Sequence, residues 1–309
     1  MRVKFWGVRG SIPSPMTVEK FQGKVSAIIQ RITPADLKSA ENREKFMAGL
    51  PEYIFSGIGG NTTCIEISHE ENSAIIVDAG TGLRVLGKQV SDSVREFHIF
   101  LTHFHWDHIQ GFPFFAPAYD PDCRITFYSP VEDFHKLLDM QMMQPFFPVR
   151  MENLKARINF FTLREPFTLG NTEISFRKVL HPGGCFSYKF VQNGKSLIVS
   201  TDTELKENDF QDTDENMNFY QDSDMIVLDA QYTMDEAVEK RNWGHSSGCL
   251  GADFVGKWNI GKFVLFHFDP DYDDRKIYDM LESVRWYSAH VAGFNSQLVL
   301  AREGLVLEV

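Results

Sequence analysis

The sequence has few cysteines, and no two of them stand close together in the chain. Only four occur among 309 residues, at Cys64, Cys123, Cys185 and Cys249. Zinc knuckles and dithiol redox motifs need two cysteines a few residues apart, so we expect neither kind of site. We predict reduced and mostly buried thiols. One alternative concerns Cys185, which follows His181 closely enough to be a thiolate ligand beside it.

The sequence also lacks a long apolar run and an excess of positive charge. No segment approaches the roughly 18 to 20 apolar residues that a membrane-spanning helix needs, and residues 1–5 contain no apolar secretory segment. The 31 Lys and Arg against 42 Asp and Glu give a net charge of −11. Because non-specific affinity for nucleic acids comes mainly from Lys and Arg, this charge argues against a large nucleic acid as partner. We therefore expect a cytoplasmic protein that acts on a small molecule.

Apolar residues are plentiful, and they recur in short segments. They make up 43% of the sequence, which is enough for a sizeable core. Helical patterns at residues 131–143 and 275–287 alternate with strand-like segments. The strand-like segments are residues 2–6, 63–67, 74–77, 97–101, 125–128, 174–179, 186–191, 197–200, 225–228, 263–266, 297–300 and 306–309. A chain of 309 residues could form one large α/β domain or two smaller ones. The alternation predicts two sheets whose outer faces are covered by helices.

One stretch near the N-terminus has a different character. Residues 17–50 are charged and favour helices: apolar residues at 25, 28, 29 and 32 have near-helical spacing, and a second helix is predicted at 36–48. We interpret residues 17–57 as a helical insertion that forms a packing or dimer element, with a lid over the active site as the alternative. Further along, the polar residues 209–224 predict a solvated loop or a short capping helix.

Three imidazoles and a carboxylate stand within six residues at the end of one strand-like segment. His103, His105, Asp107 and His108 follow the apolar residues 97–101. In a tightly turned segment His103 and His105 project to one side, while Asp107 and His108 can reach a second cation. Imidazole and carboxylate ligands together suit Zn, Mn, Fe or Ni. The segment therefore predicts a metal site rather than a chance surface cluster.

Three further potential ligands also follow strand-like segments. His181 comes after residues 174–180, Asp202 after 197–199 and His267 after 263–266. Each would be an ordinary loop residue if it stood alone. Their common position at strand ends, in a chain that already carries the 103–108 cluster, instead predicts that they complete a two-metal site.

These residues make the chain resemble the metallo-β-lactamase-fold hydrolases, whose signature H-x-H-x-D-H corresponds to residues 103–108. The resemblance extends over residues 2–267 apart from the helical insertion. It implies a single domain over residues 1–309, a four-layered αββα sandwich with a dinuclear centre between the sheets. It also implies that one metal is held by His103, His105 and His181, that the other is held by Asp107, His108 and His267, that Asp202 bridges both, and that Asp78 orients a ligand histidine from behind.

A second motif indicates a branch of this family. Gly244-His245-Ser246-Ser247 is similar to the Gly-His-Ser/Thr motif of the phosphodiesterase branch, which includes the tRNA 3′-processing endonuclease RNase Z, and it implies that His245 faces the scissile phosphate. In the alternative, His245 only caps or packs beside a helix that runs to residue 255. Residues 5–13, 59–64 and 78–82 resemble cyclic-nucleotide phosphodiesterases, including the anti-Pycsar enzymes.

The resemblance implies a phosphodiesterase that uses two divalent metals, most simply zinc, to cleave a small phosphodiester by a metal-bridging hydroxide. A cyclic nucleotide is the favoured substrate, and Asp107, Asp202 and His245 are the predicted catalytic residues. Two alternatives stay open: a thioesterase or lactonase of the same fold, and tRNA 3′ processing, which fits less well because the chain has no Gly- and Lys-rich arm. The sequence specifies neither the native metal nor the base, and it leaves a homodimer open.

Two smaller expectations concern substrate contacts. Arg9 lies on a glycine-flanked loop, where it would contact a phosphate or form an ordinary salt bridge. Aromatic residues gather at 112–115 and 145–148, and we interpret both groups as core or subunit contacts. The alternative is that Phe114 and Phe147 form a stacking wall for a nucleobase.

Overall fold

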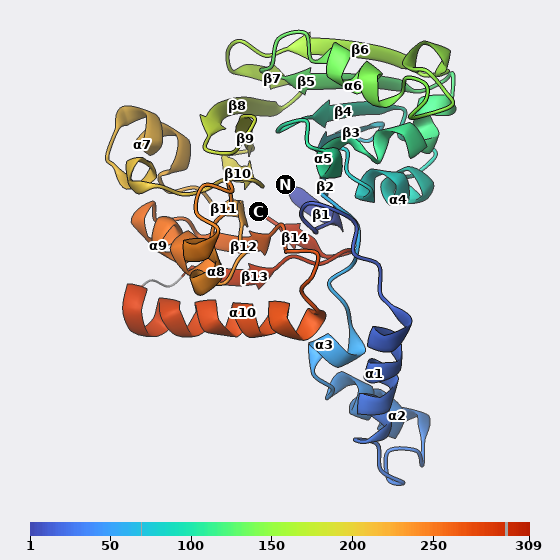
Figure 1. Cartoon of the computed structure of the whole chain (residues 1–309), viewed down its shortest axis with the longest axis vertical. Coiled ribbons are helices and arrows are strands. Elements are labelled where there is room, and N and C mark those ends of the chain that lie inside the picture. The colour runs from blue at the N-terminus through green and yellow to red at the C-terminus, as the bar shows by residue number, and fades with distance from the viewer. Residues whose placement is uncertain (69, 294–295) are drawn as a thin grey trace.

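The computed structural model of the chain describes residues 1–68, 70–293 and 296–309. Its strands form two seven-stranded sheets (Figure 1). The first sheet has, in order across it, β14 (Val306–Glu308), β1 (Arg2–Gly7), β2 (Cys64–Ser68), β3 (Ser73–Val77), β4 (Glu96–Phe100), β5 (Arg124–Ser129) and β6 (Arg157–Thr162). The second has β13 (Gln297–Leu300), β12 (Lys262–Phe266), β11 (Met225–Asp229), β10 (Lys195–Ser200), β9 (Cys185–Gln192), β8 (Thr172–Val179) and β7 (Phe167–Leu169).

Each sheet is antiparallel on one side and parallel on the other. In the first sheet, the strands from β14 to β3 pair antiparallel and those from β3 to β6 pair parallel. In the second sheet, the strands from β13 to β10 are parallel and those from β10 to β7 antiparallel. Neighbouring parallel strands end at the same edge of a sheet. The residues that follow β3 and β4, and those that follow β10, β11 and β12, are therefore brought together.

The burial of β3 shows how the layers pack. All five of its residues are buried, and their side chains alternate between two apolar clusters. Ile75 and Val77 belong to the larger cluster, which contains residues of both sheets, whereas Ala74 and Ile76 belong to the cluster that contains Leu83 of α4 (Gly82–Gln89). A strand covered on both faces needs apolar residues at consecutive positions, which explains its continuous apolar sequence.

Helices cover the outer faces of both sheets, as predicted. Figure 1 shows α4 beside the first sheet and α9 (Gly248–Lys257) and α10 (Asp274–Tyr287) beside the second. Leu83 and Leu86 of α4 are buried in the cluster of the first sheet, and Val255 of α9 and Ile277 of α10 are buried with strands of the second. The α-helices are α1 (Val18–Ile29), α2 (Ala40–Ala48), α3 (Glu52–Phe55), α4 (Gly82–Gln89), α5 (Trp106–Ile109), α6 (His135–Gln141), α7 (Asp214–Tyr220), α8 (Met234–Glu239), α9 (Gly248–Lys257) and α10 (Asp274–Tyr287). Short helical turns are η1 (Phe112–Phe114), η2 (Ala116–Tyr119), η3 (Met151–Asn153), η4 (Glu207–Phe210) and η5 (Ser288–Ala292).

The helices between β1 and β2 lie largely outside the sandwich and project away from it (Figure 1). No residue of α1 or α2, both wholly within the described part of the chain, is buried. Thr17 caps α1 and Ser39 caps α2, so the second helix begins at Ala40 instead of residue 36. The region is tied to α10 by Lys24, whose Nζ lies 2.5 Å from Asp274 Oδ2.

Some other elements differ from the sequence prediction. The prediction missed β6 and β7: β6 is an edge strand whose residues are mostly exposed, and β7 has only three residues. Helix α6 begins at His135, after the positive φ of 53° at Asp133 interrupts the predicted helix. Residues 209–224 contain the short helix α7, capped by Thr213. Among the described residues, no helix is long and apolar enough to cross a membrane.

Candidate metal centre

The sheet edges gather every predicted ligand into one place. His103 and His105 lie in the loop that follows β4, and α5 carries Asp107 and His108 directly after it. His181 follows β8, Asp202 follows β10 and His267 follows β12. His105 is exposed, and the other six side chains are buried.

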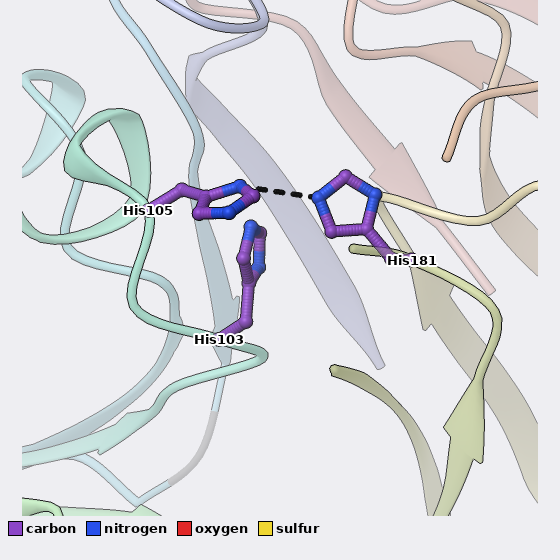
Figure 2. Close-up of side chains that lie close together, drawn as sticks. All are labelled: His103, His105 and His181. Carbon is purple, nitrogen blue, oxygen red and sulfur yellow. Dashed lines mark hydrogen bonds between the residues drawn. The ribbon is translucent and has the colours of Figure 1, made fainter. Parts of the chain in front are cut away.

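His103, His105 and His181 form the first group, with their rings turned toward one another (Figure 2). His105 Nδ1 lies 3.1 Å from His181 Nε2. The ring centroid of His103 is 4.5 Å from that of His105 and 4.8 Å from that of His181. One ligating atom from each residue falls within 4.8 Å of the others, so the three imidazoles could hold a single ion.

Asp107, His108 and His267 form the second group, on the other side of Asp202. Asp107 Oδ2 lies 3.2 Å from His108 Nε2 and 3.8 Å from His267 Nε2. The backbone N–H of Ser11 donates to the same Asp107 oxygen at 2.8 Å, which fixes its carboxylate. This group combines two imidazoles with one carboxylate, a set that accepts several divalent metals.

Asp202 lies between the two groups and faces both. Its Oδ1 is 3.2 Å from His108 Nε2, and its Oδ2 is 3.1 Å from His267 Nε2. The same Oδ2 lies 3.8 Å from His103 Nε2 and 3.7 Å from His181 Nε2. A single buried carboxylate therefore reaches histidines of both groups, which is the arrangement that a bridging ligand requires.

Backbone and side-chain acceptors behind the histidines fix their protonation. Asp78 Oδ2 lies 2.8 Å from His108 Nδ1, and Asp78 also accepts hydrogen bonds from the backbone and hydroxyl of Thr102. His181 Nδ1 lies 2.9 Å from the Gly244 carbonyl oxygen. Because a carbonyl and a carboxylate only accept, each Nδ1 carries a proton, and Nε2 is the nitrogen left to face the cluster, where its lone pair can ligate a metal whenever it is unprotonated.

Burial and charge in this cluster favour a bound cation. Burial and the neighbouring His108 hold the pKa of His103 well below its usual value, and burial likewise lowers the pKa of His181, so both rings stay neutral and able to ligate. Burial alone would also lower the pKa of His108, but Asp202, Asp107 and Asp78 raise it well above its usual value. The carboxylates thus require positive charge, which a proton or a metal ion would supply.

Several buried ligand atoms lack hydrogen-bond partners, which is what a metal site would explain. Four buried atoms, His103 Nε2, His108 Nε2, His267 Nε2 and Asp202 Oδ1, have no hydrogen-bond partner among the described residues. Buried polar atoms without partners are costly and rare. All four point into the cluster, and all four are atoms that ligate metals, so the residues present fit a pair of divalent cations.

Two glycines let the chain approach these histidines closely. A Cβ added to Gly10 would lie 2.6 Å from Nε2 of His267, and one added to Gly244 would lie 2.3 Å from Nδ1 of His181. Gly10 N also donates to the Phe268 carbonyl at 2.9 Å, which holds the loop after β1 against His267. His267 itself has a φ of +64°, a strained conformation for a residue other than glycine.

His245 lies beside both groups and does not cap the helix. Ser247 caps α9, whereas His245 Nδ1 lies 2.7 Å from Asp229 Oδ2. The His245 ring is 5.0 Å from that of His181 and 5.2 Å from that of His267 between centroids. Burial would lower the pKa of His245, but Asp229 raises it above its usual value. His245 also falls within ligating distance of His181 and Asp202, so its ring faces the cluster.

The sequence analysis missed Asp229 and two threonines. Asp229 is the last residue of β11, in the same position at a strand end as the residues that were found, and that signal could have identified it. Thr102 Oγ1 lies 3.1 Å from His103 Nδ1, and Thr63 Oγ1 lies 3.3 Å from His267 Nδ1. A threonine beside a predicted ligand carries no comparable signal, because its contact depends on how the loop folds.

Two minor expectations have clear outcomes. Arg9 is buried, and its guanidinium donates to the carbonyls of Gly59, Asp269 and Tyr272 and lies 3.7 Å from Asp274. It therefore forms the salt bridge that we considered, and it does not face the cluster.

Cys185 is a buried free thiol, and burial raises its pKa well above the usual value. It belongs to none of the groups of ligating atoms found among the described residues.

A cavity of about 450 Å³ opens onto the cluster. It is lined by Ser11, Phe104, His105, Trp106, Asp107, His181, Pro182, Asp202, Trp243, His245 and His267. No residue of α1, α2 or α3 is among these described lining residues, so the helices after β1 do not form a lid over the cluster in this structure. Phe112 and Phe115 are core residues, as expected.

The chain matches known proteins in sequence and in fold. A family model described as "Beta-lactamase superfamily domain" matches residues 73–268. Ribonuclease Z of Limosilactobacillus reuteri is 22% identical over 295 residues, covering 76% of this chain and 92% of the relative. Ribonuclease Z of Bradyrhizobium diazoefficiens is 32% identical over 84 residues, which are 27% of this chain and only 26% of the relative's length.

Solved structures share the fold at low sequence identity. The metallo-beta-lactamase fold protein YhfI from Bacillus subtilis has a TM-score of 0.65 and 14% identity, covering 99% of this chain and 98% of YhfI. A diphosphatase from the PhnP family has a TM-score of 0.63 and 15% identity, covering 100% of this chain and 97% of that chain. At such identities the likeness concerns the arrangement of the two sheets and their helices.

Proposed function

The chain belongs to the beta-lactamase superfamily, and from this membership we propose that it is a metal-dependent phosphodiesterase that hydrolyses a small phosphodiester, with a cyclic nucleotide as the favoured substrate. The observation that carries the proposal is the Asp229–His245 pair, which lies beside both groups of metal-ligating atoms. The ribonuclease Z relatives support a phosphodiester substrate, since ribonucleases cleave that bond.

The proposed metal ligands are the two groups described above, with Asp202 shared between them. In this proposal His103, His105 and His181 hold one divalent ion, and Asp107, His108 and His267 hold the other. Divalent ions in such a site supply Lewis acidity toward phosphate oxygens and make water acidic enough to attack near neutral pH. Asp78 and Gly244 keep the histidine tautomers that ligation requires.

His245 is the proposed proton donor. The Asp229 carboxylate can only accept, so Nδ1 of His245 carries one proton and Nε2 of the imidazolium carries the second. As water oxygen bonds to phosphorus and the bond to the leaving oxygen breaks, Nε2 gives its proton to the leaving alkoxide, and the attacking water loses a proton to solvent. His245 then regains a proton at Nε2 from solvent, while Asp229 keeps its hydrogen bond to Nδ1 and holds the ring in place.

A second candidate function is RNA 3′ processing, which the names of the relatives favour. From the net charge of −11 we expected no large nucleic acid as partner. The names of the relatives do not support that expectation. The thioesterase or lactonase alternative needs the same ligands. A thiolate leaves without a proton donor, whereas the alkoxide of a lactone or a phosphodiester needs one, so the Asp229–His245 pair argues against a thioester. The ribonuclease Z relatives are what favours phosphorus over carbon as the reaction centre.

A substrate panel tests these functions directly. Purified protein loaded in turn with Zn, Mn, Fe or Ni is offered cyclic mononucleotides, cyclic dinucleotides, linear phosphodiesters, a lactone, a thioester and a precursor tRNA. The proposal expects turnover of small phosphodiesters that Asp202→Asn abolishes. Turnover of a lactone or thioester alone would reject it, and turnover of precursor tRNA alone would replace it with the second candidate.

A further inference from the structure

Two tryptophans that line the cavity at the candidate metal centre are unusually exposed, and the proposed hydrolytic roles do not explain their exposure. Trp106 is 80% exposed and Trp243 is 62% exposed, although an indole is normally largely buried. Both line the cavity that opens onto the candidate ligands. We propose that Trp106 and Trp243 bind the nucleobase of the substrate by stacking, and this inference rests on the proposed phosphodiesterase function.

The same backbone segments that carry the candidate ligands also carry both tryptophans. Trp106 stands between His105 and Asp107 as the first residue of α5. Trp243 directly precedes Gly244, whose carbonyl oxygen accepts the hydrogen bond of His181 Nδ1. His105 and His181 in turn lie 3.1 Å apart (Figure 2). The two tryptophan-bearing segments therefore meet at this histidine pair, one on each side of it.

The chemistry of the cavity wall selects a flat, apolar group. No Lys or Arg is found among the described residues that line the cavity. Apart from the groups assigned to metal and proton transfer, the wall offers Ser11, Phe104, Pro182 and the two indoles. A phosphodiester held at the cluster would thus place its remaining part against an aromatic surface. A nucleobase has the planar π-face that such a surface binds, whatever the base.

Exposure alone would not support this assignment, as another residue of the chain shows. Trp286 on α10 is 61% exposed but stacks on His290, with 5.0 Å between ring centroids, and it does not line the cavity. Phe114, which is 57% exposed, packs against Phe147 at 5.4 Å, and neither lines the cavity. We therefore propose Trp106 and Trp243 as the stacking surface, in place of Phe114 and Phe147.

The test compares two esters that share a leaving group and differ in the nucleoside. Thymidine 5′-p-nitrophenyl phosphate and methyl p-nitrophenyl phosphate are given to the wild type and to Trp106→Ala, Trp243→Ala and the matched control Trp286→Ala. Base stacking is worth roughly tenfold or more in binding, so kcat/KM for the thymidine ester should fall by about that factor in the first two variants. The methyl ester should change less than about twofold, and Trp106→Phe should recover most of the loss.

A binding measurement separates this inference from the proposed function. Tryptophan fluorescence is followed while thymidine 5′-monophosphate or inorganic phosphate is added to each metal-loaded variant, which requires no turnover. Weaker binding of the nucleotide alone in Trp106→Ala and Trp243→Ala supports stacking, even if neither ester is hydrolysed and the proposed function fails. Equal loss for both esters or both ligands, no loss in either assay, or a change in oligomeric state caused by the substitutions would overturn it.

Discussion

The carboxylate of Asp229 lies 2.7 Å from Nδ1 of His245, and it also accepts hydrogen bonds from the backbone of Thr203 and Gln231. The aspartate is fully buried, so its charge acts on the imidazole with little screening by water. This contact orients the ring and determines which nitrogen faces the cavity.

We predict that Asp229→Asn lowers kcat by about 10- to 100-fold with little change in KM, because an amide can present its N–H to His245 and favour the wrong tautomer. Steady-state kinetics with a small phosphodiester, together with metal analysis, measures this effect. Asp253→Asn is the matched control, since Asp253 accepts hydrogen bonds from Tyr287 away from the cluster. Wild-type activity in Asp229→Asn would contradict the role of the pair.

Replacing Asp202 should affect metal content as well as rate. Its two oxygens face histidines of both groups, so we expect Asp202→Asn to bind fewer than two ions per chain and to lose at least about 100-fold in kcat. Elemental mass spectrometry of the dialysed protein gives the stoichiometry. Asp212→Asn, on the exposed side of the Lys257 ion pair, should retain both ions. Two retained ions in Asp202→Asn would show that the carboxylate is not a shared ligand.

Chelation should destabilise the folded chain. Ions that bind only the native state stabilise it by about 2.7 kcal/mol when their free concentration is 100 times Kd. Adding a chelator should therefore lower Tm by several degrees, and restoring single metals one at a time should identify the ion that raises it most. Asp202→Asn should respond much less. An unchanged Tm, with no metal detected before chelation, would exclude a metal centre.

A single methyl group at Gly10 should disturb the centre. The added Cβ would lie 2.6 Å from His267 Nε2, so the ring has to move, and we expect Gly10→Ala to weaken metal affinity by about 10- to 100-fold. Competition with a fluorescent chelator measures the affinity. Gly23→Ala provides the control, because nothing lies within 4 Å of its Cβ position. Equal affinities in the two variants would show that the close approach has no functional consequence.

Arg9 should contribute to stability and not to substrate binding. Removing its buried guanidinium takes a hydrogen-bond donor from the carbonyls of Gly59, Asp269 and Tyr272, whereas Asp274 keeps its ion pair with Lys24. The loss should lower the free energy of unfolding by about 1 to 3 kcal/mol for each carbonyl left without a donor. Urea denaturation of Arg9→Ala measures this change, with the exposed Arg84→Ala as reference. A large rise in KM at unchanged stability would instead restore the phosphate contact considered from the sequence.

Sequence patterns located the candidate ligands because these residues share a local signal, a polar residue directly after an apolar strand. His103 to His108 form one motif, and His181, Asp202 and His267 repeat the strand-end placement. Asp229 carries the same signal, but only the folded chain places it against His245. Only the clustered phenylalanines, Phe114 and Phe147, were considered from the sequence as an alternative stacking wall, because single residues such as Trp106 and Trp243 form no cluster. Edge strand β6 was missed although Ile158, Phe160 and Phe161 are residues that strands favour.

The contact between the loop after β1 and Phe268 has a consequence for biosynthesis. Gly10 N donates to the Phe268 carbonyl, and Phe268 N donates to the Val8 carbonyl, so segments about 260 positions apart enclose His267 together. The ribosome synthesises the segment around Gly10 early in translation and the segment around Phe268 late. The nascent chain therefore carries the His103 to His108 motif through about half of its synthesis before His267 follows, and the group of Asp107, His108 and His267 can assemble only after His267 has emerged.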